Sequence, residues 1–269
     1  STRADETGWT PLLSEDLSEH WEAWFGVPHK SLEVPGYPPQ PKSDGKKGEP
    51  IGLVDVNNDP LDLYTVSTED AEPMLRISGQ IYAGLTTLEE YENYHISLEF
   101  KWGTKKWAPR LADKRDSGLL LHCTGEHGAF WNVWMADIEC QIQEGDCGDL
   151  YLLAGTKART RARLEAGGKP VYDPTGDPIK RVTRHAPSTE KPNGEWNQIE
   201  AYVLGDDMVF VVNGTPVNAP LDCTYRGKPL TRGKIQIQSE GAEVFYRRVK
   251  IRPIAAFPDF LADHVRPLD

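Results

Sequence analysis

One run of the chain, residues 137–144, alternates polar and apolar side chains with a period of two. On a β-strand this period sends successive side chains to opposite faces of the sheet. The polar face would carry two carboxylates and two carboxamides, Asp137, Glu139, Gln141 and Gln143. Such a stripe is costly to bury without partners, and Trp131 and Trp134 lie just upstream. The pattern therefore indicates a strand that forms the floor of a sugar-binding groove.

Short strands separated by turn signals continue from about residue 51 onward. The run 94–102 carries an aromatic or aliphatic residue at every second position, and the mostly apolar run 118–123 is typical of a central strand. Further strands are predicted at 196–203, 208–213, 234–238 and 244–251. Because helical periodicity is almost absent, the sequence predicts an all-β fold built as a two-sheet β-sandwich.

The chain divides into three segments by composition. Residues 1–50 are predicted to be a peripheral segment with a Pro/Gly-rich loop packed on the sandwich, and 17–25 has the apolar spacing of a short helix. Residues 51–254 form the sandwich, and within them 150–195 is expected to be one long loop that walls or caps the groove. Residues 255–269 are a C-terminal tail.

Charge and composition narrow the classes of function. The net charge of −11 argues against a nucleic-acid partner, and no apolar run approaches the roughly 20 residues of a membrane span. The sequence contains no G-x-G-x-x-G and no G-x-S-x-G motif, so neither a nicotinamide site nor a serine nucleophile is expected. The start Ser1-Thr2-Arg3 reads like a chain whose signal peptide was removed, so we expect a periplasmic or extracellular location.

The chain has four cysteines, Cys123, Cys140, Cys147 and Cys223. None shows C-x-x-C spacing, which disfavours a zinc knuckle. Cys140 lies on the apolar face of the 137–144 strand and is expected to be a small core residue. A disulfide between Cys140 and Cys147 across the following turn is the alternative.

Six motifs follow one another in order along the chain. They are the runs 115–122 (RDSGLLLH), 138–142 (IECQI), 194–197 (GEWN), 212–214 (VNG), 233–241 (GKIQIQSEG) and 244–251 (VFYRRVKI). Together they resemble the 3-keto-disaccharide hydrolase domain family, which has the concanavalin A-like lectin/glucanase fold. The resemblance implies an antiparallel jelly-roll β-sandwich. The chain departs from the family at Asp116, His122 and Arg248, where Asn, Arg and Asn are usual.

The resemblance implies cleavage of glycosidic bonds beside a ketone at sugar C3. The ketone acidifies the hydrogen at C2, so a base can form an enolate that expels the group at C1, and water adds later. Glu139 is the first candidate for the catalytic base and His122 is the second. Ordinary hydrolysis by Asp137 and Glu139 is the alternative, because residues two apart on a strand lie about 6.6 Å apart between Cα atoms.

The same resemblance leaves room for a divalent metal ion that holds the ketone and a neighbouring hydroxyl. His122, Glu139 and Asp146 would offer its nitrogen and oxygen ligands. Because no nicotinamide cofactor is expected, a separate sugar 3-dehydrogenase would supply the oxidised substrate.

Candidate substrate-binding residues carry side chains that can stack on sugar rings or bond hydroxyls: Gln141, Trp131, Trp134, Arg115, Lys157 and Gln238. Glu240 accompanies Gln238 on its strand, and His185 is a further rim candidate. Each also has a structural interpretation, since aromatic residues fill cores and acids in Gly-rich turns bond the backbone. Two other functions stay open, a lectin-like carbohydrate-binding module and a structural domain of an extracellular assembly.

Overall fold

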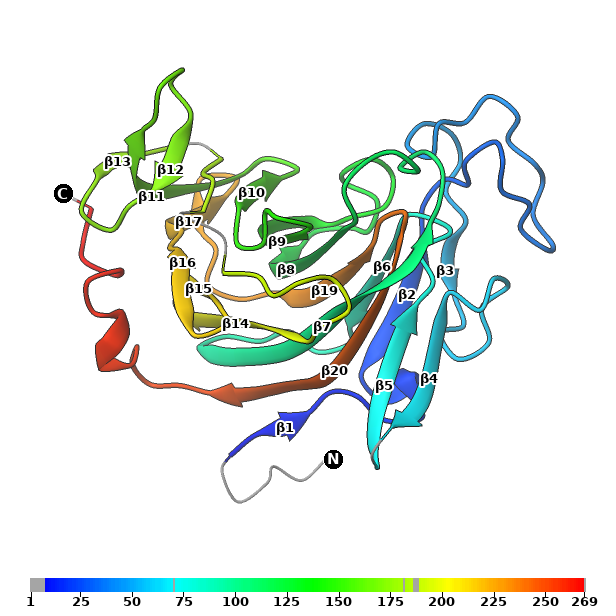
Figure 1. The fold of residues 1–269 in the computed structure, drawn as a ribbon, viewed down its shortest axis with the longest axis horizontal. Coiled ribbons are helices and arrows are strands. Elements are labelled where there is room, and N and C mark those ends of the chain that lie inside the picture. Colours follow the sequence, from blue (N-terminus) through cyan, green and yellow to red (C-terminus); the bar gives the residue numbers. More distant parts are fainter. Residues whose placement is uncertain (1–7, 70, 181, 186–188, 269) are drawn as a thin grey trace.

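The computed structural model describes residues 8–69, 71–180, 182–185 and 189–268. Over these residues the strands form three antiparallel sheets of eight, seven and five strands. Figure 1 shows the two larger sheets stacked on each other, which is the predicted two-sheet jelly-roll sandwich. The helices in the described ranges are 3-10 turns, and none is long and apolar enough to cross a membrane.

The eight-stranded sheet is called here the outer sheet. Its order is β16 (Thr215–Asn218), β15 (Asp207–Val212), β14 (Asn197–Leu204), β7 (Tyr94–Lys106), β20 (Ala242–Pro253), β5 (Glu72–Ile77) and β4 (Tyr64–Glu69), with β1 (Thr10–Pro11) paired to β20. Alternate residues of β7 from Tyr94 to Trp102 are buried in the main core, as the sequence predicted.

The seven-stranded sheet is called the inner sheet. Its order is β10 (Leu150–Leu153), β9 (Ala136–Gln143), β8 (Asp116–Thr124), β19 (Lys234–Ser239), β6 (Ala83–Thr87), β2 (Trp21–Phe25) and β3 (Gly52–Val54). Ile138, Cys140 and Ile142 of β9 lie in the core between the two sheets. The polar residues of β9 consequently lie on the opposite face, away from this core.

A third sheet stands at one end of the inner sheet (Figure 1). It consists of β12 (Pro170–Tyr172), β11 (Thr156–Leu164), β17 (Leu221–Tyr225) and β18 (Lys228–Pro229), with β13 (Asp177–Ile179) paired to β11. The prediction of one long loop over 150–195 is therefore wrong, because this segment supplies β10 to β13. Alternate residues of β11, including Ala158 and Ala162, are buried while the basic residues between them reach solvent.

The N-terminal segment also differs from its prediction. Residues 17–25 form the 3-10 turn η1 (Leu17–Glu19) and the strand β2 instead of a short helix. Trp21, Ala23 and Phe25 alternate into the core, and β2 pairs with both β6 and β3. The described part of the segment, residues 8–50, thus contributes strands to the sandwich, and its loop beyond β2 lies at the periphery, at the end opposite β11 (Figure 1).

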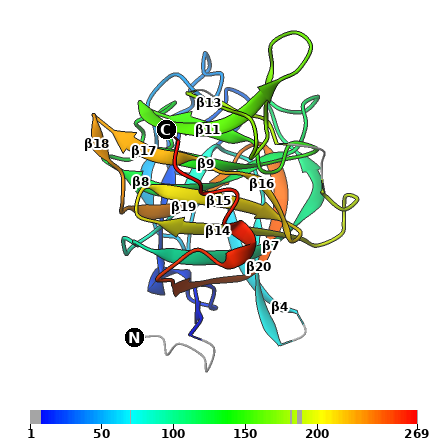
Figure 2. The ribbon, with the colours of Figure 1, turned by 90° about the vertical axis from the view of Figure 1, so that its left-hand side faces the viewer.

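The C-terminal tail packs on the outer sheet, crossing β14 and β15 in Figure 2. It contains the 3-10 turn η2 (Asp259–Leu261), and Leu261 and Leu268 are buried in a small cluster with Tyr202 and Val209. All four cysteines are buried free thiols. Cys140 is the core residue that the alternation predicted, and the alternative disulfide to Cys147 does not form.

Candidate active site

The polar face of the inner sheet is assembled by three adjacent strands, β9, β8 and β19. Their register sets Gln141 opposite Gly118, and it sets Leu120 between Glu139 on one side and Gln236 on the other. A cavity of about 280 Å³ lies on this face. Its polar lining consists of Arg110, Asp116, Glu139, Gln141, Gln143, Tyr151, Gln238 and Glu240. The candidates Glu139, Gln141 and Gln238 are thereby brought together.

Gly118 provides the space that this cluster needs. A Cβ on Gly118 would lie 2.5 Å from Oε1 of Glu139 and 2.5 Å from Oε1 of Gln238. Any other residue would push one or both oxygens away, since real Cβ atoms do not approach other heavy atoms so closely. Glycine inside a strand is costly for the sheet and often marks such a close approach.

Glu139 lines the cavity although its side chain is almost fully buried, at 4 % exposure. Its Oε1 accepts no hydrogen bond from the described residues. Burial first, then the charges of Asp137 and Asp116, raise the pKa of Glu139 well above its usual range. Its surroundings therefore favour the neutral carboxylic acid, the form that can donate a proton.

Asp116 has a different environment in the same cavity. Arg110 binds its Oδ2 at 2.6 Å, and Nε2 of Gln143 donates to the same oxygen at 2.6 Å. Burial raises the pKa of Asp116 to about 7, against the opposing effect of Arg110 and Gln143. Near neutral pH this carboxyl exists in both forms, so it can take up a proton and release it again.

Arg110 also contacts Glu240, with Nη1 at 3.4 Å from Oε1. Burial and the charge of Asp116 raise the pKa of Glu240 well above its usual range. The cavity thus holds the Arg110 cation between a carboxyl that ionises near neutrality and one whose burial favours the protonated form.

Several buried oxygens on this face have no donor among the residues of the described ranges. They are Oδ1 of Asp116, both carboxyl oxygens of Asp137, Oε1 of Glu139, Oε1 of Gln236 and Oε1 of Gln238. Buried acceptors are normally paired, and leaving one unpaired costs about 1–3 kcal/mol. Those in the cavity wall are suited to the hydroxyl groups of a sugar, which donate hydrogen bonds.

Asp137 shares the polar face of β9 but does not line the cavity. Its side chain is fully buried, and its pKa is raised well above the usual range because burial disfavours the charge. Ionisation of either acid disfavours ionisation of the other, because a charge on Asp137 raises the pKa of Glu139.

Aromatic residues form one wall of the cavity: Phe130, Trp131 and Trp134. Trp134 is buried, whereas Trp131 is 38 % exposed. Lys46, from the loop after β2, places its ammonium 3.7 Å from the centroid of the Trp131 ring. The backbone of Trp131 has a φ of 53° and that of Asn132 a φ of 61°, a conformation that non-glycine residues rarely adopt. Trp131 is thus held at the cavity by a constrained turn.

His122, the second candidate for the base, does not line the cavity. The register of β8 shifts near its end, and His122 takes a φ of 50°. The bulge turns the ring into the core, where Nδ1 lies 2.9 Å from the carbonyl oxygen of Leu230 and the ring meets Tyr94 edge-on. Burial lowers the pKa of His122 to about 4, so the ring is neutral.

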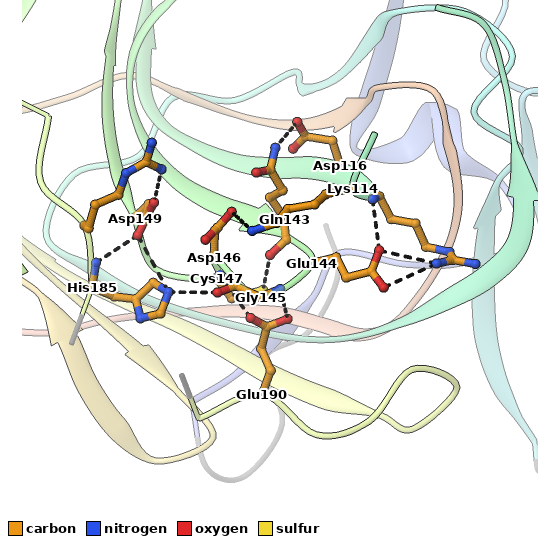
Figure 3. Close-up of polar contacts among 12 residues, drawn as sticks. Lys114, Asp116, Gln143, Glu144, Gly145, Asp146, Cys147, Asp149, His185 and Glu190 are labelled. Atoms are coloured by element: carbon orange, nitrogen blue, oxygen red, sulfur yellow. Dashed lines mark hydrogen bonds and ion pairs between the residues drawn. The ribbon is translucent and has the colours of Figure 1, made fainter. Parts of the chain in front are cut away.

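Three further candidates lie outside the cavity. Arg115 binds the backbone carbonyl of Gly103 at 3.1 Å and the carboxylate of Glu144. Lys157 lines a separate cavity beside β11. Asp146 pairs with Lys114 in the turn after β9 (Figure 3).

The three residues expected to hold a metal ion do not fit one. His122 faces the core, Asp146 lies in the turn beyond β9, and Glu139 lies in the cavity. Among the residues described, no three His, Cys, Asp or Glu side chains are grouped closely enough to bind a metal.

Sequence reasoning missed Arg110 and gave Asp116 no catalytic role. Asp116 carried a signal, because it departs from the family pattern. Arg110 carried none, since it comes from a loop and reaches Asp116 and Glu240 only through the fold.

Residues 8–252 match the family described as the 3-keto-alpha-glucoside-1,2-lyase-like domain. The comparison with curated proteins gave no match.

Similar solved structures include a candidate glycosyl hydrolase from Parabacteroides distasonis ATCC 8503, at 17 % identity and a TM-score of 0.47 over 91 % of this chain and 99 % of that chain. The carbohydrate-binding module CBM66 from Bacillus subtilis matches at 9 % identity and a TM-score of 0.43, over 70 % of this chain and 91 % of the module. The alginate lyase AlyC3 matches at 9 % identity and a TM-score of 0.44, over 94 % of this chain and 98 % of the lyase. Because the family match spans nearly the whole chain, this protein belongs to the family of 3-keto-alpha-glucoside-1,2-lyase-like, carbohydrate-related domains.

Proposed function

We propose that the cavity on the inner sheet cleaves the glycosidic bond of 3-keto-glycosides by elimination, followed by addition of water. One observation carries the proposal: Asp116 and Glu139 line the same cavity in environments that give them different protonation states. Two carboxyls separated in this way can serve as a base and an acid in one reaction.

The first step is removal of the hydrogen at C2, which the C3 ketone acidifies. The C2–H electron pair forms an enolate between C2 and C3. The enolate then collapses, restoring the ketone, forming a double bond between C1 and C2, and breaking the bond from C1 to the leaving oxygen. The leaving oxygen takes up a proton. Water can later add across the new double bond, which gives the free 3-keto sugar.

Asp116 is assigned as the base for the C2 hydrogen. Arg110 keeps a fraction of this carboxyl ionised despite its burial, and its Oδ1 is not engaged by the described protein groups. Glu139 is assigned as the acid, because its raised pKa keeps a proton available for the leaving oxygen. This assignment differs from the sequence prediction, in which Glu139 was the first candidate for the base.

Glu240 is assigned as the donor to the enolate oxygen. Its burial favours the protonated form, it lies against Arg110, and it lines the same cavity. A neutral acid and a nearby cation, both largely buried, can stabilise developing negative charge. Gln141 and Gln238 would bind hydroxyl groups, and the exposed part of Trp131 would stack on a sugar face.

The substrate must arrive already oxidised at C3. We therefore include in the proposal a separate sugar 3-dehydrogenase that supplies it.

The test compares a 3-keto-glucoside with the same glucoside before oxidation, with products followed by mass spectrometry. We expect cleavage of the oxidised compound only. Glu139→Gln should slow release of methanol strongly but release of 4-nitrophenol much less, because a good leaving group needs little protonation. Asp222→Asn, which alters an exposed ion pair with Arg159, is the control and should keep full activity.

A lectin-like module remains the second candidate, favoured by the exposed Trp131 beside polar oxygens. Binding of both glucosides by the parent protein with no turnover of either would support the module and contradict the enzyme.

A further inference from the structure

A second cavity, of about 550 Å³, adjoins the catalytic cavity. Gln143 lines both, and its Nε2 binds Asp116 at 2.6 Å (Figure 3). The other walls of the second cavity come from the loop before β8, the turn after β9 and the segment from β11 to His185. A substrate unit joined to a sugar in the first cavity could therefore extend past Gln143 into the second.

The second cavity has a cationic wall in a chain whose net charge is −11. Lys114, Arg163, Lys169 and Arg184 supply four positive charges, while Asp146, Asp149 and Glu165 supply three negative ones. An excess of one positive charge at a concave site is opposite in sign to the protein as a whole.

The acids do not neutralise these cations equally. Asp149 is fully buried, where it binds Arg184 and accepts the backbone N–H of His185 at 2.8 Å (Figure 3). Its charge is therefore held within the protein. Lys169 is exposed and makes no ion pair with a described residue.

The remaining ion pairs are exposed. Lys114 is 54 % exposed and pairs with Asp146, and Arg163 is 55 % exposed and lies 3.7 Å from Glu165. Exposed pairs contribute little and exchange partners readily. Lys114, Arg163, Lys169 and the free N–H groups of Arg184 are consequently available to an anion.

The two cavities differ in the chemistry that they offer. The first presents carboxyls, carboxamides and four aromatic residues, which suit an uncharged sugar ring. The lining of the second contains no Phe, Trp or Tyr, and Val171 is its one aliphatic side chain. Its guanidinium groups can form paired hydrogen bonds with a carboxylate, which a neutral hydroxyl cannot match.

We propose that the second cavity is the leaving-group subsite and that it selects a leaving unit carrying a carboxylate, such as a uronic acid. The inference rests on the proposed function, because it assigns the other half of the same substrate.

The experiment compares three compounds that share one 3-keto-glucosyl unit and release glucuronate, glucose or methanol. The expected kcat/KM for glucuronate release exceeds that for glucose release roughly tenfold or more, as charge-assisted hydrogen bonds allow. The difference should shrink as salt rises, since the cations are exposed.

Lys169→Ala and Arg163→Ala should remove most of this preference while leaving methanol release unchanged. Arg159→Ala is the matched control, because Arg159 also lies on β11 and pairs with an exposed acid, but beside a different cavity. Equal kcat/KM values for glucuronate and glucose release in the parent would overturn the subsite.

Failure of the proposed function has a different signature, because then none of the three compounds is cleaved. In that case the probe is methyl glucuronide, titrated calorimetrically into the parent and into both variants. Binding by the parent that is lost in Lys169→Ala and Arg163→Ala would still support the cationic site, and no binding by the parent would overturn it.

Discussion

The carboxyl of Glu139 and the carboxamide of Gln238 meet across Gly118, each with its Oε1 2.5 Å from the position that a Cβ on Gly118 would occupy. They come from the two strands that flank β8 in the inner sheet. The positions of the proposed acid and of a proposed substrate-binding group therefore depend on residue 118 being a glycine.

Gly118→Ala should lower kcat/KM about 100-fold, because displacing a catalytic group by an ångström has effects of that order. Gly84→Ala is the matched control: there a Cβ would clash with the side chain of Gln236, which does not line the cavity. Both variants are checked by thermal unfolding and steady-state kinetics. Equal losses of activity in the two variants would mean that the effect is on folding and not on the site.

The rate should depend on the ionisation of Asp116. Its pKa of about 7 means that the carboxylate fraction grows as pH rises through that value, so kcat/KM should rise there. The rate should fall only at higher pH, where Glu139 loses its proton, because its pKa is raised well above the usual range. Measurements from about two pH units below to two above this pKa would show the rising limb, and the falling limb should lie above it.

Gln143→Leu provides the internal check on that assignment. The hydrogen bond from Gln143 lowers the pKa of Asp116, so its removal should move the rising limb to higher pH. A limb that stays in place, or a rate that falls through pH 7, would contradict the role of Asp116.

Asp137 should make the protein less stable as pH rises. Burial raises its pKa in the folded state, so between the unfolded and folded pKa values the folded state binds more protons. The free energy of unfolding then falls with pH by about 1.4 kcal/mol per pH unit for this group. Asp137→Asn should flatten the curve obtained by urea unfolding at several pH values. Parallel curves for the parent and the variant would show that Asp137 is not held protonated.

Lys46 occupies one face of the Trp131 ring, with its ammonium 3.7 Å from the ring centroid, and would compete there with a stacked sugar. Breaking this cation–π contact is worth about 0.5–1 kcal/mol at such a site, so Lys46→Met should lower KM roughly twofold to fivefold. Trp131→Ala should raise KM with little change in kcat. If Lys46→Met raises KM instead, Lys46 itself binds the substrate.

The alternation of β9 was readable because one face is apolar and the other polar, and this pattern also fixed the position of Cys140 in the core. The strands of residues 150–195 were hidden, because their basic residues and turn signals resemble a loop and β11 pairs with the distant strand β17. Residues 17–25 illustrate an ambiguity of period: Trp21 and Phe25 fit a helix as well as the strand that the pairing with β6 selects.

Only those site residues whose direction follows from the two-residue alternation of a strand could be predicted from the sequence. Glu139, Gln141 and Gln238 follow that period, whereas His122 leaves it at a bulge. Arg110 reaches Asp116 from a loop, and no local pattern encodes such a contact.

The central claim is that cleavage begins with removal of the hydrogen at C2. The direct test uses a 3-keto-glucoside that carries deuterium at C2, with a parallel sample lacking protein to correct for spontaneous exchange. The account predicts slower cleavage than for the undeuterated compound and a released sugar that has lost its deuterium to the solvent. Cleavage at an unchanged rate, with the deuterium retained in the released sugar, would contradict it.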